Sequence, residues 1–469
     1  MLFSGRRTFP LFISSSVRRW LCSRPYVLWI LILLLIVSVA LQSFAAQLAS
    51  PPMLIGLLPL RLPPLKNTPT DLHLRSSLAE KHLQNGNPDF SNEGSFKNIS
   101  DNTLRTKRVF TRETCHPKIH IVFLKTHKTG SSSVLNILYR FGESRNLTFA
   151  LPVNKQVQLF YPHFFSAHFV EGFSSTRVKD FHIMCNHMRF RKPEVAKVMP
   201  KDTFYFSILR HPVSMMESIF VYYKSIPAFR KAHSLENFLN TCWKTYSSSE
   251  TSNQYAHNVL AFDFGLPNNV DPKDLDQKAG QAIAAIEQDF QLVLISDYFE
   301  ESMVLLKHSL CWSLEDVVSF RLNSRSVRTR HKVSPETEEQ IKRWNALDWR
   351  IYLHFNSTFW TKVDRLIGRQ KMKAEVSQLK SLQAELASTC LKGGGAVDPS
   401  KIEDSDLKPF QYGAAVIQGY NLNPHLDAQT KRKCQRLVTP ELQYTHQLYA
   451  RQFPQASAHL RLPTKTGSL

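Results

Sequence analysis

The chain has 469 residues, of which 43% are hydrophobic, so it is long enough to bury a sizeable core and is not a disordered chain. Fifty-nine basic against 38 acidic side chains give a net charge of +21, which implies an anionic ligand, acceptor or surface. Nucleic acid is the first partner to weigh, but the sequence has no Cys/His finger, aromatic RNP-like run or dense basic helix.

An uncharged apolar run, residues 27–46, is about as long as a helix that crosses a bilayer. Arginines without acidic residues precede it, so the positive-inside rule keeps residues 1–26 cytoplasmic and the rest lumenal. The small residues around Ala46 resemble a signal-peptide cleavage site, but the apolar run is longer than in a signal peptide. The sequence therefore predicts a transmembrane signal-anchor in a single-pass, type II membrane protein.

Residues 47–115 are rich in Pro, Asn and Ser and predict a lumenal stem. Glycosylation sequons, which fit a lumenal location, begin at Asn98, Asn146 and Asn356. Cys22 lies beside the membrane span, where it is either palmitoylated or an idle thiol. The six later cysteines allow fifteen full disulfide pairings, among which the sequence does not choose, and none of their spacings suggests zinc.

The first strand–loop–helix unit starts after the stem. Residues 119–124 form an apolar, β-branched run typical of a buried strand, and residues 133–138 have helical spacing. The turn between them is rich in Gly, Ser and Thr and contains Lys125 and Lys128. Because such a turn presents backbone N–H groups to one point, beside two lysines, it predicts a phosphate or phosphosulfate site.

Further units of the same kind follow. Residues 178–190 contain a second strand or strand end, and residues 203–209 form a buried-type strand that leads through Arg210 into a helix over 213–223. Residues 290–295 form the third strand of the buried type, after 119–124 and 203–209, and precede a helix over 302–310. Repeated strand–turn–helix units predict an α/β fold with a central parallel sheet flanked by helices, and ligands at the carboxyl ends of the strands.

The last part of the chain is predicted to be helical over 336–344, 349–355 and 372–391. The last of these helices carries one apolar stripe, which favours packing within the fold over an oligomer seam: Met372, Val376, Leu379, Leu382 and Leu386. Several tryptophans are candidates for stacking on a sugar, although a core position is favoured for each: Trp243, Trp312, Trp344, Trp349 and Trp360.

The loop is not a nucleotide-triphosphate P-loop. That motif needs G-x-x-x-x-G-K-[ST], whereas here Lys125 stands at the first glycine position and Ser131 at the lysine position. The lysines precede the glycine instead. In that arrangement Lys128 is able to reach a bridging leaving-group oxygen, while the following residues supply backbone and hydroxyl donors.

The segment LKTHKTGSSS, followed about 80 residues later by SILRHPVSMMESIF, resembles the pair of motifs with which sulfotransferases bind 3′-phosphoadenylyl sulfate. The phrases CNHMRF, FRLNSRSVR, ALDWRIYLHFN and RLVTPELQY resemble the galactose-3-O-sulfotransferase family in particular. The resemblance runs from about Lys118 to Pro454. It implies a P-loop-like sulfotransferase fold over 116–460, a Golgi membrane location, 3′-phosphoadenylyl sulfate as co-substrate, and no obligatory metal.

The resemblance also implies roles for residues. The 5′-phosphosulfate loop comprises Lys125, Thr126, Lys128, Thr129, Gly130, Ser131, Ser132 and Ser133. Arg210 and Ser218 match the residues that hold the 3′-phosphate. The stretch 321–332 resembles the loop that closes over the adenosine, and within it Arg325 and Arg328 are the candidate contacts.

The implied reaction is in-line transfer of a sulfuryl group to the 3-hydroxyl of a terminal β-galactose on a glycoprotein or glycolipid. Lys128 would neutralise the leaving phosphate, and a histidine would serve as general base because a sugar hydroxyl is a poor nucleophile. His187 matches the family's usual base best, His127 is second, and His182 is a third candidate. Each of these side chains also has a purely structural interpretation, such as a solvated lysine or a histidine that positions backbone.

Other functions stay open on the sequence. They are a sulfotransferase for another sugar position, a type II glycosyltransferase and a non-catalytic lumenal glycan-binding protein. A glycosyltransferase typically carries an Asp-x-Asp metal motif, and only Asp404-Ser405-Asp406 has that spacing, in a polar segment away from the predicted sheet. The preferred acceptor linkage and the formation of a homodimer are not decided by local motifs.

Overall fold

The computed structural model describes residues 115–174 and 180–459. Within these residues, no helix is both long and apolar enough to cross a bilayer. The predicted signal-anchor, the stem up to residue 114, Cys22 and Asn98 lie outside the described residues.

A four-stranded sheet with the order β2-β1-β3-β4 forms the framework of the described part. Its strands are β1 (Ile121–Leu124), β2 (Ile183–Met184), β3 (Phe204–Leu209) and β4 (Leu292–Ile295). All neighbouring strands are parallel, and Val122 is aligned with Met184 on one side and Tyr205 on the other. The predicted parallel sheet is therefore confirmed, and each predicted strand is present.

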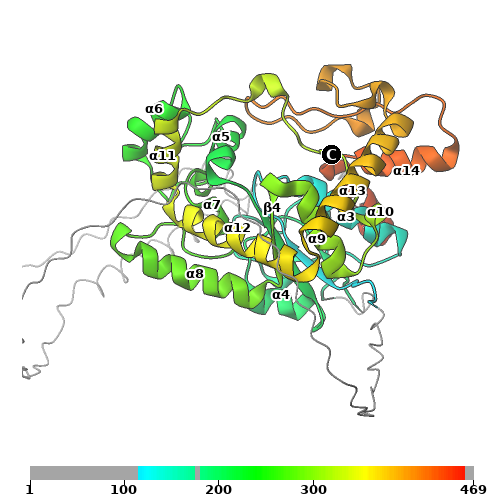
Figure 1. Cartoon of the computed structure of the whole chain (residues 1–469), viewed down its shortest axis with the longest axis horizontal. Coiled ribbons are helices and arrows are strands. Elements are labelled where there is room, and N and C mark those ends of the chain that lie inside the picture. The colour runs from blue at the N-terminus through cyan, green and yellow to red at the C-terminus, as the bar shows by residue number, and fades with distance from the viewer. Residues whose placement is uncertain (1–114, 175–179, 460–469) are drawn as a thin grey trace, which may run out of the picture. The chain divides into compact units, whose positions relative to one another are not determined.

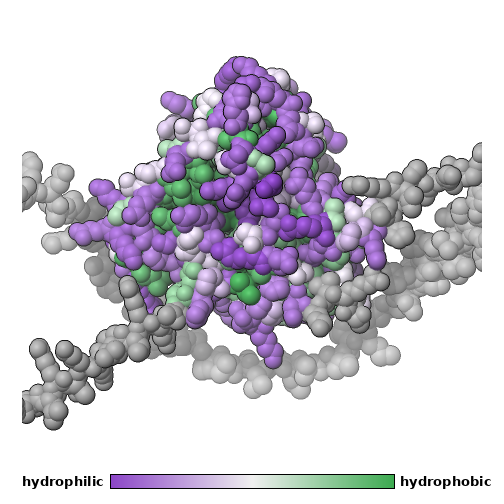
Figure 2. All heavy atoms as spheres, turned by 90° about the vertical axis from the view of Figure 1, so that its right-hand side faces the viewer, coloured by the Kyte–Doolittle hydropathy of each residue, from purple (hydrophilic) through white to green (hydrophobic). Residues whose placement is uncertain are grey.

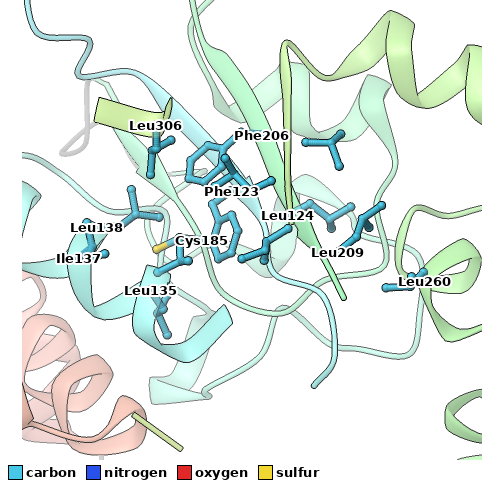
Figure 3. Packing of buried hydrophobic residues seen from close by; sticks show 14 of the residues in the cluster. Phe123, Leu124, Leu135, Ile137, Leu138, Cys185, Phe206, Leu209, Leu260 and Leu306 are labelled. Atoms are coloured by element: carbon cyan, nitrogen blue, oxygen red, sulfur yellow. The ribbon is translucent and has the colours of Figure 1, made fainter. Parts of the chain in front are cut away.

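The strands are apolar along their whole length because both faces of the sheet are covered. Every residue of β1 and β4 is buried. Phe123 of β1 stacks on Phe206 of β3 with 4.8 Å between ring centroids. Figure 3 shows these rings between Leu135 and Leu138 on one side and Leu209 on the other, with the Cys185 sulfur close to the first pair. One continuous core thus holds the strand ends in place.

The helices follow the pattern expected for strand–turn–helix units. Their bounds are α3 (Ser131–Ser144), α4 (Lys192–Val198), α5 (Pro212–Tyr222), α6 (Leu235–Asn240), α7 (Val259–Asp263), α8 (Leu275–Asp289), α9 (Phe299–Leu310), α10 (Leu314–Val317), α11 (Pro335–Trp344), α12 (Ala346–Leu366), α13 (Arg369–Cys390), α14 (Ala428–Val438), α15 (Glu441–Gln452) and α16 (Pro454–His459). Figure 1 shows α8 and α12 side by side on one side of β4, and α3, α9, α10 and α13 gathered on the other. The sheet is therefore a layer between helices.

The predicted helix over 349–355 lies in the first half of the longer α12, which continues to Leu366 because the sequence places neither glycine nor proline in between. The predicted packing role of the following helix is confirmed. Helix α13 lies against α9, and its Glu375 carboxylate accepts hydrogen bonds from Lys307 Nζ and His308 Nε2, each at 2.8 Å. Its apolar stripe is buried within the chain apart from Leu382, which is partly exposed.

Two disulfides connect distant parts of the chain. Cys115 pairs with Cys311 at the end of α9, and Cys390 at the end of α13 pairs with Cys434 in α14. Cys185 is buried, and burial raises the pKa of its thiol. The structure thus supplies pairings that the cysteine spacing left undetermined.

Two irregular segments lie together near the ends of the strands. The first, residues 321–333, follows α10, and the second, residues 409–419, is here called the strap. Ser326 N donates to Val416 O at 2.9 Å, and Gln418 N donates to Ser324 O at 3.0 Å. The face seen in Figure 2 is mostly hydrophilic, with apolar areas confined to small patches.

Candidate active site

Polar side chains hold the loop between β1 and α3 in one shape. Thr126 Oγ1 donates to the Ile208 carbonyl at 2.5 Å, and Thr129 Oγ1 lies 2.9 Å from Thr126 Oγ1. Ser131 Oγ donates to the Thr126 carbonyl at 2.7 Å. Gly130, the residue before α3, has a φ of 76°, a left-handed conformation that glycine adopts without steric penalty. The first turn of α3 then offers backbone N–H groups that suit an anion.

A cavity of about 800 Å³ opens above this loop. The segment after each strand contributes to its lining: the loop itself after β1, His187 after β2, Arg210 after β3 and Ser296 after β4. The cavity therefore lies at the carboxyl ends of the parallel strands, where ligands of such sheets bind.

Several positive side chains line this cavity: Lys125, Lys128, Arg210, Arg321, Arg325 and Arg330. Burial, and then the charges of its basic neighbours, lowers the pKa of Lys128 to about 7. Burial also lowers the pKa of Arg210, which donates to the Lys128 carbonyl at 3.1 Å. Because positive charges this close repel one another, the cavity is electrostatically suited to an anion of more than one charge.

Segment 321–333 is anchored beside Ser218 by a buried ion pair. The Arg325 guanidinium pairs with the Glu217 carboxylate and donates to the Thr329 carbonyl at 2.8 Å. The other Glu217 oxygen accepts a hydrogen bond from His331 N at 3.2 Å. Glu217 thus holds one cation of the cavity in place and ties this segment to α5.

His187 is held by two contacts with the same lysine. Its Nδ1 lies 2.8 Å from the Lys125 carbonyl and its Nε2 lies 2.8 Å from Lys125 Nζ. Since the ammonium donates and the carbonyl accepts, Nδ1 carries the proton and Nε2 accepts. Burial, then Lys125 and His127, lowers the pKa of His187 well below its ordinary value. The ring is therefore neutral, with its lone pair occupied by Lys125.

Lys125 also contacts an acidic residue of the C-terminal helices. Its Nζ lies 3.1 Å from Glu441 Oε2, at the start of α15, and Ser132 Oγ donates to the same oxygen at 2.8 Å. Lys125 thus bridges Glu441 and His187 while lining the cavity. A carboxylate among these cations offsets part of their mutual repulsion.

His127 forms a dyad with Asp263, the last residue of α7. Its ring stacks on His187 at 4.1 Å, its Nδ1 lies 3.0 Å from Asp263 Oδ1, and its backbone N donates to Asp263 Oδ2 at 2.9 Å. Tyr161 Oη donates to the same carboxylate at 2.9 Å. His127 Nε2 is buried and has no hydrogen-bond partner among the described residues. A carboxylate on Nδ1 leaves Nε2 as the free acceptor of a residue that lines the cavity.

Comparison with known proteins assigns the chain to a family. The family model described as galactose-3-O-sulfotransferase matches residues 16–452. This chain belongs to the galactose-3-O-sulfotransferase family.

Similarity to individual relatives agrees with the family assignment. The chain is 51% identical over 342 residues to the Sus scrofa galactose-3-O-sulfotransferase 2, covering 72% of this chain and 85% of that protein. It is 37% identical to the Bos taurus galactose-3-O-sulfotransferase 4, covering 75% of this chain and 86% of that protein. It is 39% identical to the human galactosylceramide sulfotransferase, covering 72% of this chain and 79% of that protein.

The structure brings most of the residues expected from the family resemblance into one cavity. Those that line it are Lys125, His127, Lys128, Gly130, Ser131, Ser132, Ser133, His187, Arg210, Ser218 and Arg325. Thr126 and Thr129 lie buried beneath the loop, where they hold its shape. Arg328 is exposed and does not line the cavity, whereas its neighbour Arg330 does.

The remaining sequence candidates lie elsewhere. His182 Nδ1 accepts a hydrogen bond from Thr148 N, outside the cavity lining. The five candidate tryptophans do not line the cavity either. Of the described sequons, Asn146 is exposed just after α3, and Asn356 is partly buried within α12.

Sequence reasoning missed the residues that support this sulfotransferase site: Asp263, Tyr161, Glu217 and Glu441. Asp263 carried a readable signal, because a carboxylate inside the apolar run VLAFDFG needs a buried partner. Glu441 stands within the family phrase RLVTPELQY. Glu217 stands within the quoted motif SILRHPVSMMESIF, directly before Ser218. Nothing local marked Tyr161, which joins the site only through the fold.

Proposed function

We propose that this chain is a sulfotransferase that moves a sulfuryl group from 3′-phosphoadenylyl sulfate to the 3-hydroxyl of a terminal β-galactose. The observation that carries the proposal is one cavity that joins an anion-binding loop and a cation cluster to the His127–Asp263 dyad, in a chain of this family. The donor supplies an activated sulfuryl group; the protein supplies position, charge and a base.

The donor fits the cavity by charge and by topology. The first turn of α3 and Lys128 hold the phosphosulfate, while Arg210 and Ser218 hold the 3′-phosphate. Segment 321–333, anchored through Arg325 and Glu217, covers the adenosine. This division follows the sheet, since β1 and β3 are adjacent and their loops flank one crevice.

Charge stabilisation by Lys128 and proton removal by a base drive the transfer. A bond forms between the galactose 3-oxygen and sulfur while the bond from sulfur to the bridging phosphate oxygen breaks. Lys128 neutralises the charge that develops on the leaving phosphate. The products are the 3-sulfated galactoside and adenosine 3′,5′-bisphosphate, and the hydroxyl proton passes to the base.

The geometry favours His127 over His187 as that base. His127 Nε2 is an unoccupied acceptor in a ring oriented by Asp263, whereas His187 Nε2 is occupied by Lys125. A base needs a free lone pair within reach of the hydroxyl and a group that stabilises its charged form. The role proposed for His187 is to hold Lys125 in place, which reverses the order expected from the family resemblance.

Three alanine variants test this assignment. His127→Ala should lower kcat by about 10²- to 10⁴-fold at saturating donor and acceptor, the usual contribution of a general base. His187→Ala should lower kcat less and raise the KM for the donor, because Lys125 loses its support. His182→Ala, a control histidine outside the cavity lining, should match the wild type. A larger kcat loss in His187→Ala than in His127→Ala would restore His187 as the base.

The acceptor position is tested directly. Incubating the enzyme with labelled donor and a panel of β-galactosides, including a galactolipid, should place sulfate on the galactose 3-oxygen. Sulfate at another sugar position would replace this function by the second candidate, and absence of transfer with retained donor binding would favour a binding protein. The chain is 51% identical to the relative named galactose-3-O-sulfotransferase 2 and 39% identical to the human galactosylceramide sulfotransferase, which supports an acceptor other than galactosylceramide.

The proposed location is the Golgi membrane, with residues 1–26 cytoplasmic and the catalytic part lumenal. The uncharged run 27–46 and the arginines before it support this topology. In intact Golgi vesicles, protease should spare the catalytic part and remove only an N-terminal tag. Digestion of the catalytic part without detergent would contradict the proposed orientation.

A further inference from the structure

The strap places two large aromatic rings on the surface. Phe410 is 56% exposed and Tyr412 is 36% exposed, with 6.3 Å between their ring centroids. Phe410 also lines the cavity that contains Lys128 and His127. Exposed apolar side chains gathered at the edge of a cavity are a common mark of a ligand-binding surface.

These rings continue inward to the dyad. Tyr412 lies 5.8 Å from Tyr223, Tyr223 stacks on Tyr255 at 4.0 Å, and Tyr255 lies 5.0 Å from His127, all between ring centroids. A second branch runs from Tyr412 to Tyr222 at 5.1 Å. An unbroken series of aromatic rings therefore leads from the surface to the proposed base.

The second branch ends at the proposed leaving-group cation. Lys128 Nζ lies 3.7 Å from the centroid of the Tyr222 ring. Tyr222 and Tyr223 also line the cavity. In an in-line transfer the nucleophile lies opposite the leaving group, on the side of the base. The rings connected to His127 consequently border the space through which the acceptor reaches the sulfuryl group.

The strap is held firmly against the end of α5. Gly413 has a φ of 61°, and a Cβ at this position would lie 2.1 Å from the Tyr222 carbonyl oxygen, so only glycine fits. Ala414 N donates to the Val221 carbonyl at 3.3 Å. Gln411 both donates to and accepts from the Ile417 backbone, at 3.0 and 2.8 Å. These contacts fix the backbone of the strap next to Phe410.

We propose that Phe410, supported by Tyr412, is the platform for the second sugar of the acceptor, the one to which the terminal galactose is attached. This inference rests on the proposed function. A pyranose ring has an apolar face of C–H groups that packs on an aromatic ring, and its hydroxyls remain in water at the rim. The galactose itself occupies the inner part of the cavity, between the platform and His127.

The test compares an acceptor of one sugar with an acceptor of two. With methyl β-galactoside, Phe410→Ala should change KM less than about twofold; with β-galactosyl-N-acetylglucosamine, it should raise KM about tenfold. The kcat and the KM for the donor should stay at wild-type values. Phe410→Trp should restore the KM for the disaccharide. Phe164→Ala is the matched control, because Phe164 is 42% exposed and does not line the cavity.

Three results would overturn the platform in an enzyme that sulfates both acceptors. They are an unchanged KM for the disaccharide in Phe410→Ala, equal increases for both acceptors, and an increase in the KM for the donor, which would place adenosine against Phe410. A wild-type enzyme that sulfates no galactoside would instead overturn the proposed function, and the platform with it. The two failures are therefore distinguishable from the wild-type activity alone.

Discussion

Donor binding should depend on pH through Lys128. Its pKa is lowered to about 7, first by burial and then by the charges of Arg325, Lys125 and Arg210. Below pH 7 the free enzyme carries the proton that the phosphosulfate needs, and above pH 7 the proton must be taken up on binding. Because the protonated fraction falls from about nine-tenths at pH 6 to about one-tenth at pH 8, the Kd for the donor should rise about tenfold across this interval.

The variant Lys128→Arg isolates this effect. An arginine stays protonated throughout the interval, so the Kd of this variant for the donor should lack the pH dependence that deprotonation of Lys128 causes. The 3′-phosphate of the donor also titrates near this range, but it does so equally with both proteins. The difference between the two curves therefore reports the side chain at position 128. Lys201→Arg, at an exposed position away from the cavity lining, is the control and should follow the wild type.

Isothermal titration calorimetry measures both quantities. Titrations at pH 6, 7 and 8 give the Kd, and titrations in two buffers with different enthalpies of ionisation give the protons taken up. The wild type should take up close to one more proton per donor at pH 8 than Lys128→Arg does. Parallel Kd curves for wild type and Lys128→Arg, with equal proton uptake, would refute this account of the cation cluster.

Three further changes have defined outcomes. Asp263→Asn should lower kcat at least about 10²-fold with little change in the Kd for the donor, because His127 loses the carboxylate that orients it. Asp202→Asn, which removes an exposed carboxylate partner of His120, is the control, and equal kcat values for the two variants would contradict the dyad. Glu441→Gln should tighten donor binding about fivefold, about 1 kcal/mol, because one negative charge is removed from the anion site. Weaker donor binding in calorimetry would contradict this and would mean that Lys125 needs the Glu441 carboxylate to stay in position. Cys390→Ala should lower the free energy of unfolding by about 4 kcal/mol, measured by denaturant titration, because its disulfide closes a loop between residues 44 apart; no loss would show that this loop is already ordered in the unfolded chain.

The strand–turn–helix units were readable from the sequence because their information is local. The apolar run that became β1 and the Gly/Ser/Thr turn before α3 each follow from a few consecutive residues. The joint role predicted for Arg210 and Ser218 also rests on local information, since one belongs to the turn after β3 and the other to the helix that follows this turn. Helix α13 was predicted for the same reason, from the period of its apolar stripe.

The sequence marked Asp263 as a carboxylate in need of a buried partner, but local patterns did not reveal which residues contact the histidines. Asp263 is 136 residues from His127, and Tyr161 is 102 residues from Asp263, so only packing brings their side chains together. Glu441 contacts Lys125 for the same reason, from the far end of the chain. Arg330 lines the cavity and the predicted Arg328 does not. Tertiary contacts decide between them, because a run of basic residues does not show which side chain faces the cavity.

The amino-acid sequence by itself determined the class of ligand and the place of its site. A loop with lysines before its glycine, an arginine after a second strand and an excess of positive charge predict an anion at the ends of parallel strands. Only the tertiary structure decided which histidine has a free lone pair, because that depends on Lys125 contacting His187 and Asp263 contacting His127. Hydrogen-bond partners of buried groups are set by packing between distant segments, and hydrophobic periodicity carries no information about them.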